Sequence, residues 1–296
     1  MKNSYLAGVF LAFISGIIWG FSGVCGEFLF TNKHFDPFWL TSVRLLASGL
    51  ILFAIVFTKY KFKVFEIFSD RSALFDLGLY AIFGLALCQL TYYFTISYSN
   101  AAIATTLQYT APAMIMIFVC IKERNFPTFR EFIALVFATS GIFFFATHGN
   151  FQNLVISKEA LIIGLLSALC VVIYSIAPIK ISQKYGTNAV LALGLIMSGG
   201  VFWIFYAIFG GEILPSIDFS AFLVICAIVF LGTICGFSLY MIAVNFIGPK
   251  RASLVASIEP LMAALFGHFW LGSKFVFFDY LGFTLIILCA VLLSKK

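Results

Sequence analysis

Long apolar stretches, separated by short polar segments, follow one another along the sequence. Charged residues, prolines and glycines divide it into ten such stretches, each close to the ~20 residues that a helix needs to cross a bilayer. Their approximate limits are 4–30, 35–58, 73–97, 101–121, 129–148, 159–182, 187–210, 219–245, 250–272 and 275–294. No charge occurs from Leu77 to Ile121, but this run is too long for one crossing. The polar turn SYSNAA therefore separates the third stretch from the fourth. The pattern predicts an all-α integral membrane protein with ten transmembrane helices.

The positive charges support this number of helices independently. If the N-terminus lies in the cytoplasm and successive helices alternate in direction, fourteen of the 18 Lys and Arg residues fall on the cytoplasmic side. Lys33, Lys158 and Lys274 fall in outer loops, and Arg44 lies within a span. Cytoplasmic loops of membrane proteins carry an excess of Lys and Arg, so both termini are predicted to be cytoplasmic. This sorting explains the net charge of +6 without a nucleic-acid partner.

The composition agrees with a lipid environment. Hydrophobic residues make up 62% of the chain and charged residues 10%, whereas a soluble domain has roughly 25% charged residues. The first apolar stretch runs from Tyr5 to about Phe30, too long for a signal peptide, so we expect a retained first helix. The seven cysteines lie inside apolar segments and form no C-x-x-C pair. Neither a metal nor a disulfide is therefore expected, and no cofactor is predicted.

An internal repeat divides the chain into halves. TLQYTAPAM (106–114) aligns with LVASIEPLM (254–262) at an offset of 148 residues, half the length of the chain. The same offset aligns Gly84 with Gly232 and Tyr92 with Tyr240. Residues 1–149 and 150–296 are therefore predicted to form two repeats of five helices. Because five is odd, the second repeat enters the membrane inverted, an arrangement typical of alternating-access transporters with a binding site near the midplane.

Glu259 and Pro260 interrupt one of the apolar stretches. Glu259 lies about nine residues from Lys250, or roughly 14 Å along a helix, close to the centre of a hydrocarbon core ~30 Å thick. Burial penalises the charged form of a carboxyl, and ionisable groups at such depth commonly serve function. Glu259 is thus a candidate for substrate binding and proton coupling. The alternative is a permanently neutral glutamic acid that only hydrogen-bonds a neighbouring helix.

Arg44 is the other charge within an apolar stretch. It lies about six residues into the second stretch, roughly 9 Å from the outer surface at helical rise. Two roles are open: a salt bridge with Glu27 that joins the first two helices, or an anchor for a substrate carboxylate.

Further polar and aromatic residues have spacings that place them on shared helix faces. Trp19 lies between Ser15 and Ser22, and Gln108 lies between Thr105 and Pro112. Single serines and threonines are expected to pack helices together, and the prolines are equally well explained as kinks. The candidate substrate-binding residues are Trp19, Arg44, Gln89, Tyr92, Gln108, Pro112, Tyr174, Tyr240 and Glu259.

The sequence resembles the drug/metabolite transporter superfamily, in particular its EamA-type members with ten helices in two repeats. The resemblance covers essentially the whole chain and is carried by SGIIWGFSGV, TSVRLLASGLIL, AAIATTLQYTAPAMIMIFVCIKER and RASLVASIEPLMAALFGHFWLG. The third of these contains Glu123 at a family-like position. The chain departs from the family at Gly272–Ser273, where the second repeat often closes with Gly-Glu. The resemblance implies a transporter of amino acids or other small metabolites.

The prediction is a secondary transporter, exporter or importer, that moves small metabolites by alternating access through a central cavity of a multi-pass protein in the cytoplasmic membrane. One alternative is a membrane-embedded lipid-modifying enzyme, although such enzymes usually show clustered His, Asp or Glu residues. Another is a non-transporting membrane receptor, although the short loops leave little surface for partners. Expected partners are a small-molecule substrate, the lipid bilayer and, as a coupling candidate, protons. Both a monomer and a homodimer remain open.

Overall fold

The computed structural model describes residues 2–148, 156–209, 216–256 and 258–294, which are helical or lie in connecting turns, with no strand among them. The first half contains α1 (Lys2–Asn32), α2 (Pro37–Tyr60), α3 (Arg71–Leu79), α4 (Leu87–Tyr98), α5 (Ala101–Gln108), α6 (Ala111–Glu123) and α7 (Phe129–Thr147). The second contains α8 (Lys158–Ile176), α9 (Pro178–Tyr185), α10 (Thr187–Phe209), α11 (Phe219–Ala227), α12 (Gly236–Ile247), α13 (Pro249–Ala256), α14 (Glu259–Phe266) and α15 (Phe277–Ser294).

Four segments depart from α-helical geometry. A 3-10 helix, η1 (Lys61–Ser69), continues α2. Two π-helical segments, η2 (Tyr80–Ala86) and η3 (Ile228–Cys235), join α3 to α4 and α11 to α12, and a third, η4 (Gly267–Leu271), ends α14. Within the described ranges, six helical runs are long and apolar enough to cross a membrane: Tyr5–Asn32, Pro37–Ser69, Arg71–Tyr98, Lys158–Tyr185, Thr187–Tyr206 and Phe219–Ile247. The prediction of an all-α membrane protein is confirmed, and that of ten crossings stays a prediction.

Two of the expected helices are interrupted. Stretch 101–121 is divided into α5 and α6, and stretch 250–272 into α13 and α14, so the expectation of one continuous helix in each was wrong. Proline has no N–H to bond the carbonyl four residues earlier. Pro112 therefore cannot bond Gln108, and Pro260 cannot bond Ala256, the residues at which α5 and α13 end. The expected SYSNAA turn is present, where the Asn100 side chain accepts a hydrogen bond from the backbone N–H of Ile103 and caps α5.

The element boundaries repeat at the offset seen in the sequence. Five elements of the first half begin 148 residues before an element of the second: α3 and α11, η2 and η3, α5 and α13, α6 and α14, and α7 and α15. The N-caps of α3 and α11, Asp70 and Asp218, are separated by the same number. Both the helix breaks and the π-helical segments therefore recur in matching places.

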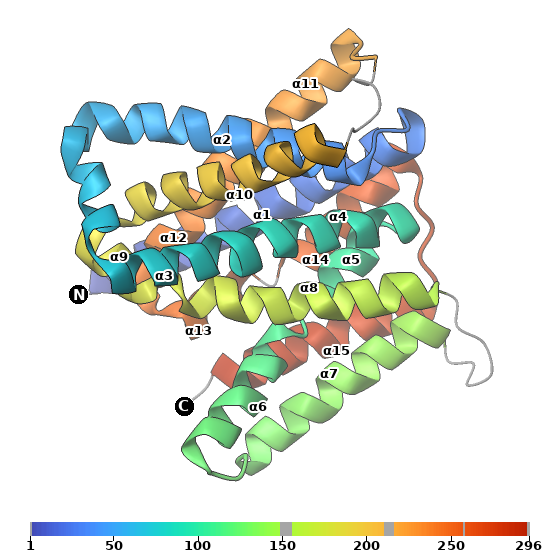
Figure 1. The fold of residues 1–296 in the computed structure, drawn as a ribbon. Coiled ribbons are helices and arrows are strands. Elements are labelled where there is room, and N and C mark those ends of the chain that lie inside the picture. Colours follow the sequence, from blue (N-terminus) through green and yellow to red (C-terminus); the bar gives the residue numbers. More distant parts are fainter. Residues whose placement is uncertain (1, 149–155, 210–215, 257, 295–296) are drawn as a thin grey trace.

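The helices also pack in a way that reflects the repeat. α2 lies against its counterpart α10, and α7 lies against α15. In both pairs the chains run in opposite directions (Figure 1). α1 packs on α12, and its counterpart α8 packs on α4. Each half thus completes the core of the other, and antiparallel pairing of counterparts is what an inverted repeat requires.

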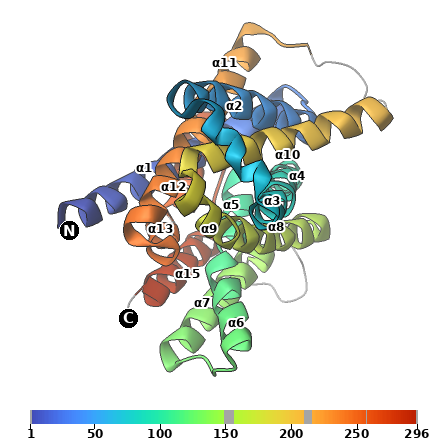
Figure 2. The same ribbon diagram turned by 60° about the vertical axis from the view of Figure 1, so that its left-hand side comes forward.

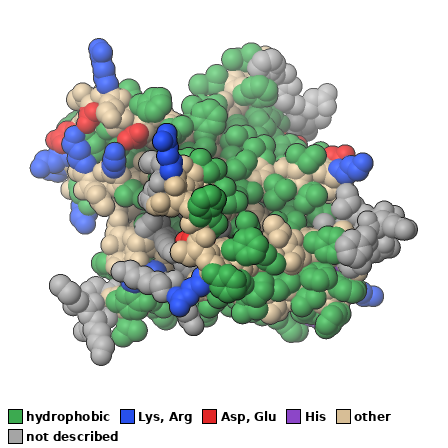
Figure 3. Space-filling view, turned by 90° about the horizontal axis from the view of Figure 1, so that it is seen from below, with side chains coloured by type: hydrophobic (Ala, Val, Ile, Leu, Met, Phe, Trp, Pro, Cys, Tyr) green, Lys and Arg blue, Asp and Glu red, His purple; other side chains and the backbone are tan. Residues whose placement is uncertain are grey.

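The exterior separates apolar and charged regions. Apolar side chains cover much of the face in Figure 3, while Lys, Arg, Asp and Glu gather toward the ends of the molecule. Large hydrophobic residues such as Phe10, Leu50 and Ile162 are exposed along the helices, as expected for a surface in contact with lipid. α1 begins and α15 ends at the same end of the bundle (Figures 1 and 2).

Candidate functional site

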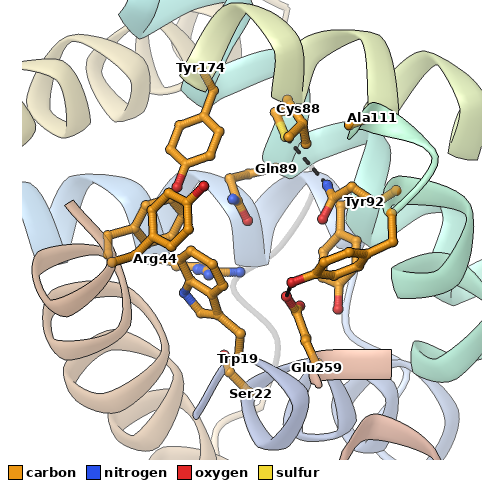
Figure 4. A pocket seen from close by; sticks show the side chains of 15 residues that line it. Trp19, Ser22, Arg44, Cys88, Gln89, Tyr92, Ala111, Tyr174 and Glu259 are labelled. Carbon is orange, nitrogen blue, oxygen red and sulfur yellow. Dashed lines mark hydrogen bonds between the residues drawn. The ribbon is translucent and has the colours of Figure 1, made fainter. Parts of the chain in front are cut away.

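A cavity of about 70 Å³ lies at the junction of the two halves. Its walls come from α1, α2, α4, α5, α6, α8, α12 and α14, and from the turn between α5 and α6 (Figure 4). Eight of the nine residues singled out in the sequence line it: Trp19, Arg44, Gln89, Tyr92, Gln108, Tyr174, Tyr240 and Glu259. The ninth, Pro112, is the second residue of α6, next to the lining residue Ala111. The Pro112 side chain lies outside what the structure describes, so its part in the site stays a prediction.

Aromatic rings from three helices form one wall. The Trp19 indole donates Nε1–H to the Gly232 carbonyl at 3.0 Å, and its ring lies 5.0 Å from that of Tyr240. Tyr174 stacks on Tyr240 with 6.0 Å between ring centroids. Gly236 makes this packing possible, because a Cβ there would lie 2.5 Å from Nε1 of Trp19. The Gly232 carbonyl belongs to η3, so a π-helical segment fixes the orientation of the indole.

Arg44 is buried beside the cavity, and its guanidinium reaches toward the centre (Figure 4). Its Nε–H donates to Thr233 Oγ1 at 2.8 Å, and its guanidinium carbon lies 5.1 Å from the centroid of the Tyr93 ring. In the described structure Glu27 does not pair with it. The Glu27 carboxylate instead accepts the backbone N–H of Ala101 at 2.8 Å, at the N-terminus of α5, where the helix dipole favours an anion. Of the two roles left open for Arg44, the salt bridge with Glu27 is therefore not formed, and the role of substrate anchor stays a prediction.

Glu259 begins α14 at the second helix break, and its side chain is buried in the cavity wall. The Tyr109 hydroxyl, from the turn between α5 and α6, lies 3.0 Å from Oε2 of Glu259 and 2.5 Å from the carbonyl of Ala256. Sequence reasoning missed Tyr109, although it lies within the aligned segment TLQYTAPAM, three residues before Pro112. The two interrupted helices thus meet through this residue.

A hydrogen-bond network holds the opposite wall. Gln108 Nε2 donates to Ser167 Oγ at 2.8 Å, and Ser167 donates in turn to the Cys88 carbonyl at 3.3 Å. The hydroxyls of Tyr92 and Thr105 are 3.0 Å apart. These bonds join α4, α5 and α8, so Gln108 and Tyr92 contribute structure as well as a polar surface.

Two buried hydroxyls that line the cavity have no hydrogen-bond partner within the described residues. They are Ser22 Oγ, on α1, and the phenol of Tyr174, on α8. An unsatisfied buried polar group is costly, which is why such groups call for an explanation. Their position makes them available to a molecule that enters the cavity.

A cavity lined by polar and aromatic side chains, between two helical repeats and inside an apolar exterior, is typical of membrane transporters. The model of the EamA-like transporter family matches residues 6–147 and again residues 158–295. The chain therefore belongs to the EamA-like transporter family, as its motifs indicated. It is a multi-pass protein of the cytoplasmic membrane, and the family assignment favours transport over the lipid-modifying enzyme and the receptor.

Individual relatives agree with this assignment. A Salmonella typhimurium protein named as the uncharacterized inner membrane transporter YicL is 34% identical over 97% of this chain and 94% of its own length. The threonine/homoserine exporter RhtA of Escherichia coli K12 is 26% identical over 84% of this chain and 78% of its own. A solved crystal structure covering 99% of this chain and 97% of its own shares the fold, with a TM-score of 0.66 at 16% identity.

Proposed function

We propose that the protein is a secondary transporter that moves small zwitterionic metabolites, amino acids or close relatives, by alternating access. The observation that carries this proposal is the presence of one guanidinium, that of Arg44, and one carboxyl, that of Glu259, among the residues that line the same buried cavity with an aromatic wall. A guanidinium binds a carboxylate through two parallel hydrogen bonds, and a carboxylate binds an ammonium. The rings of Trp19 and Tyr240 would then contact the remainder of the substrate.

The size of the cavity supports a mechanism in which the walls move. A cavity of about 70 Å³ holds a few waters, since one water needs ~10–15 Å³. A substrate as large as an amino acid therefore requires the walls to separate. Because the walls belong to both halves, a rocking motion of one repeat against the other would widen the cavity toward one side and then toward the other.

The architecture proposed for this motion is ten transmembrane helices in two inverted repeats, with their boundary near residue 150 and both termini in the cytoplasm. Supporting it are the repeated element boundaries, the antiparallel packing of counterpart helices and the matching distribution of positive charge. We further propose that Glu259 couples substrate movement to protons, because an ammonium and a proton would compete for the same carboxylate.

The relative named threonine/homoserine exporter suggests the first compounds to examine. Purified protein would be melted with threonine or homoserine, and in parallel with N-acetylthreonine and threonine amide. A ligand stabilises the folded state by RT ln(1 + [L]/Kd), so binding raises the melting temperature. The proposal expects stabilisation by at least one free amino acid in a wider panel, and none by its N-acetyl or amide derivative, since each lacks one of the two charges. Equal stabilisation by free and blocked forms would exclude zwitterion recognition.

Uptake of the stabilising amino acid into liposomes that contain the protein completes the test. Transport should be saturable and should be absent from liposomes without protein. Binding without any movement of substrate would instead indicate the receptor alternative.

A further inference from the structure

The break between α13 and α14 leaves the Ala256 carbonyl without the backbone donor that a continuous helix would provide. In an α-helix the Ala256 carbonyl would accept the backbone N–H of residue 260, but Pro260 has none. The phenol of Tyr109 lies 2.5 Å from this carbonyl and donates to it. The same phenol oxygen lies 3.0 Å from Oε2 of Glu259. Tyr109 comes from the corresponding break in the first repeat, so this contact joins the two halves.

A phenol carries one hydrogen, so it can donate to one of these two oxygens at a time. When Glu259 is neutral, its own O–H can donate to the phenol oxygen while the phenol donates to Ala256. When Glu259 is ionised, it has no hydrogen to give and becomes the stronger acceptor. The phenol hydrogen then turns to the carboxylate, and the Ala256 carbonyl loses this donor.

The other charged and titratable groups around Glu259 come from the helices that pack against it. α2 presents Arg44, α4 presents Cys88 and Tyr92, α8 presents Tyr174, and α12 presents Tyr240. On the packed neighbours α1 and η4, Glu27 bonds Ala101 and His268 bonds the Ser273 carbonyl. Thiols and phenols are neutral at pH 7, so Arg44 is the fixed charge that faces Glu259 among the described lining residues.

We propose that Tyr109 is a positioning residue that couples the protonation of Glu259 to the break between α13 and α14. With neutral Glu259, Tyr109 bonds the Ala256 carbonyl, which Pro260 leaves without a backbone donor, and so holds the break in its present shape. Ionisation of Glu259, favoured by an ammonium group of a substrate, withdraws the phenol and frees the break to change shape. This inference extends the proposed proton-coupled function and names the residue through which Glu259 acts on the helices.

Infrared difference spectroscopy between acid and alkaline pH tests the first part on the purified protein in lipid. The C=O band of the neutral Glu259 carboxyl is identified by its absence from Glu259→Gln. Tyr109→Phe keeps the ring but removes the oxygen that accepts the Glu259 O–H, so this band is expected to move to higher wavenumber. Tyr92→Phe is the matched control, because that phenol lines the same cavity but bonds Thr105. A band that Tyr109→Phe leaves unmoved would overturn the proposal.

Hydrogen exchange of the backbone of residues 258–266 tests the second part. The exchange rate of the native protein is divided by that of Glu259→Gln at each pH, which cancels the intrinsic pH dependence. The ratio is expected to be near one at acid pH and to rise several-fold as Glu259 ionises. In a Tyr109→Phe background the ratio should stay near one throughout, whereas an equal rise there would overturn the proposal. Neither measurement uses a substrate, so a failure of transport would reject the proposed function separately.

Discussion

At the scale of single residues, Arg44 is held at its Nε and on one face of its guanidinium. Thr233 accepts from Nε, and the Tyr93 ring lies under the guanidinium, while the rest of the group reaches into the cavity. Lysine would keep the charge but lose the planar fork that binds a carboxylate through two bonds. We expect Arg44→Lys to weaken binding of the stabilising amino acid about tenfold, or about 1.4 kcal/mol, as measured by ligand-dependent melting. Unchanged affinity would show that Arg44 does not anchor the carboxylate.

Glu259 is expected to decide whether transport responds to pH. Glutamine keeps the shape and hydrogen bonding of this side chain but cannot take up a proton. Liposomes containing Glu259→Gln should lose accumulation driven by a pH gradient, while exchange of labelled for unlabelled substrate continues. Full pH-driven accumulation by the variant would remove Glu259 as the coupling group and leave it a packing role.

The charged residues of the site could be found from the sequence, whereas their partners could not. Arg44 and Glu259 stand out because they interrupt apolar stretches. Arg44 bonds a residue 189 positions away, and Glu27 bonds a backbone N–H 74 positions away. Such pairings depend on how distant helices pack, which no local pattern encodes. Tyr109 was missed for the same reason, since its importance comes from the facing break in the other repeat.

At the scale of the helices, the apolar stretches and the charged residues, prolines and glycines between them predicted where the elements lie. They did not predict the departures from α-helical geometry within those elements. The π-helical segments η2 and η3 carry no distinctive residue pattern, yet both receive serine hydroxyls from the facing helix. Ser198 donates to the Ala81 carbonyl at 2.7 Å, and Ser48 donates to the Val229 carbonyl at 3.3 Å. Ala81 and Val229 are again 148 residues apart, so the repeat extends to individual contacts.

The break before α14 is expected to serve movement rather than stability. Pro260→Ala restores an N–H that can bond the Ala256 carbonyl within the helix, a bond worth ~1 kcal/mol. The melting temperature should hold or rise, while the transport rate should fall about tenfold as the break closes. Pro37→Ala is the control, because Pro37 begins α2, where a helix needs no N–H. A normal transport rate in Pro260→Ala would show that the break is not needed for movement.

At the scale of the whole molecule, two ion pairs join the repeats at opposite ends of the bundle. Lys184 lies 2.8 Å from Asp70, and Lys33 lies 2.5 Å from Asp218. Asp70 and Asp218 are the repeat counterparts that cap α3 and α11. The Asp70–Lys184 pair lies at the end where α1 begins, and the Lys33–Asp218 pair lies at the end where α1 finishes (Figure 1). Each pair thus links the two halves at one end of the molecule.

The pH range in which these pairs act follows from their carboxyl groups. The hydrogen bond from the paired lysine lowers the pKa of each aspartate from 3.8 to about 2. A carboxyl whose pKa is lower in the folded state stabilises that state above its unfolded pKa, and the contribution is lost as the pH falls from about 4 to about 2. Both aspartates therefore stay ionised between pH 6 and 8. Any pH dependence of transport in that range has to come from another group, for which Glu259 is the proposed one.

Alternating access requires that the two ends open separately, and the ion pairs allow this to be tested. Asp70→Asn and Asp218→Asn remove the charge but keep an oxygen that can cap the helix. Cys88, which lines the buried cavity, serves as the probe for a membrane-impermeant maleimide. If Lys33–Asp218 closes the outer end, Asp218→Asn should raise labelling of Cys88 several-fold in intact cells. Asp70→Asn should raise it in inverted membrane vesicles instead, and Cys88→Ser in each background supplies the blank. An increase from the same side for both variants would contradict both the predicted sidedness and the assignment of one ion pair to each end.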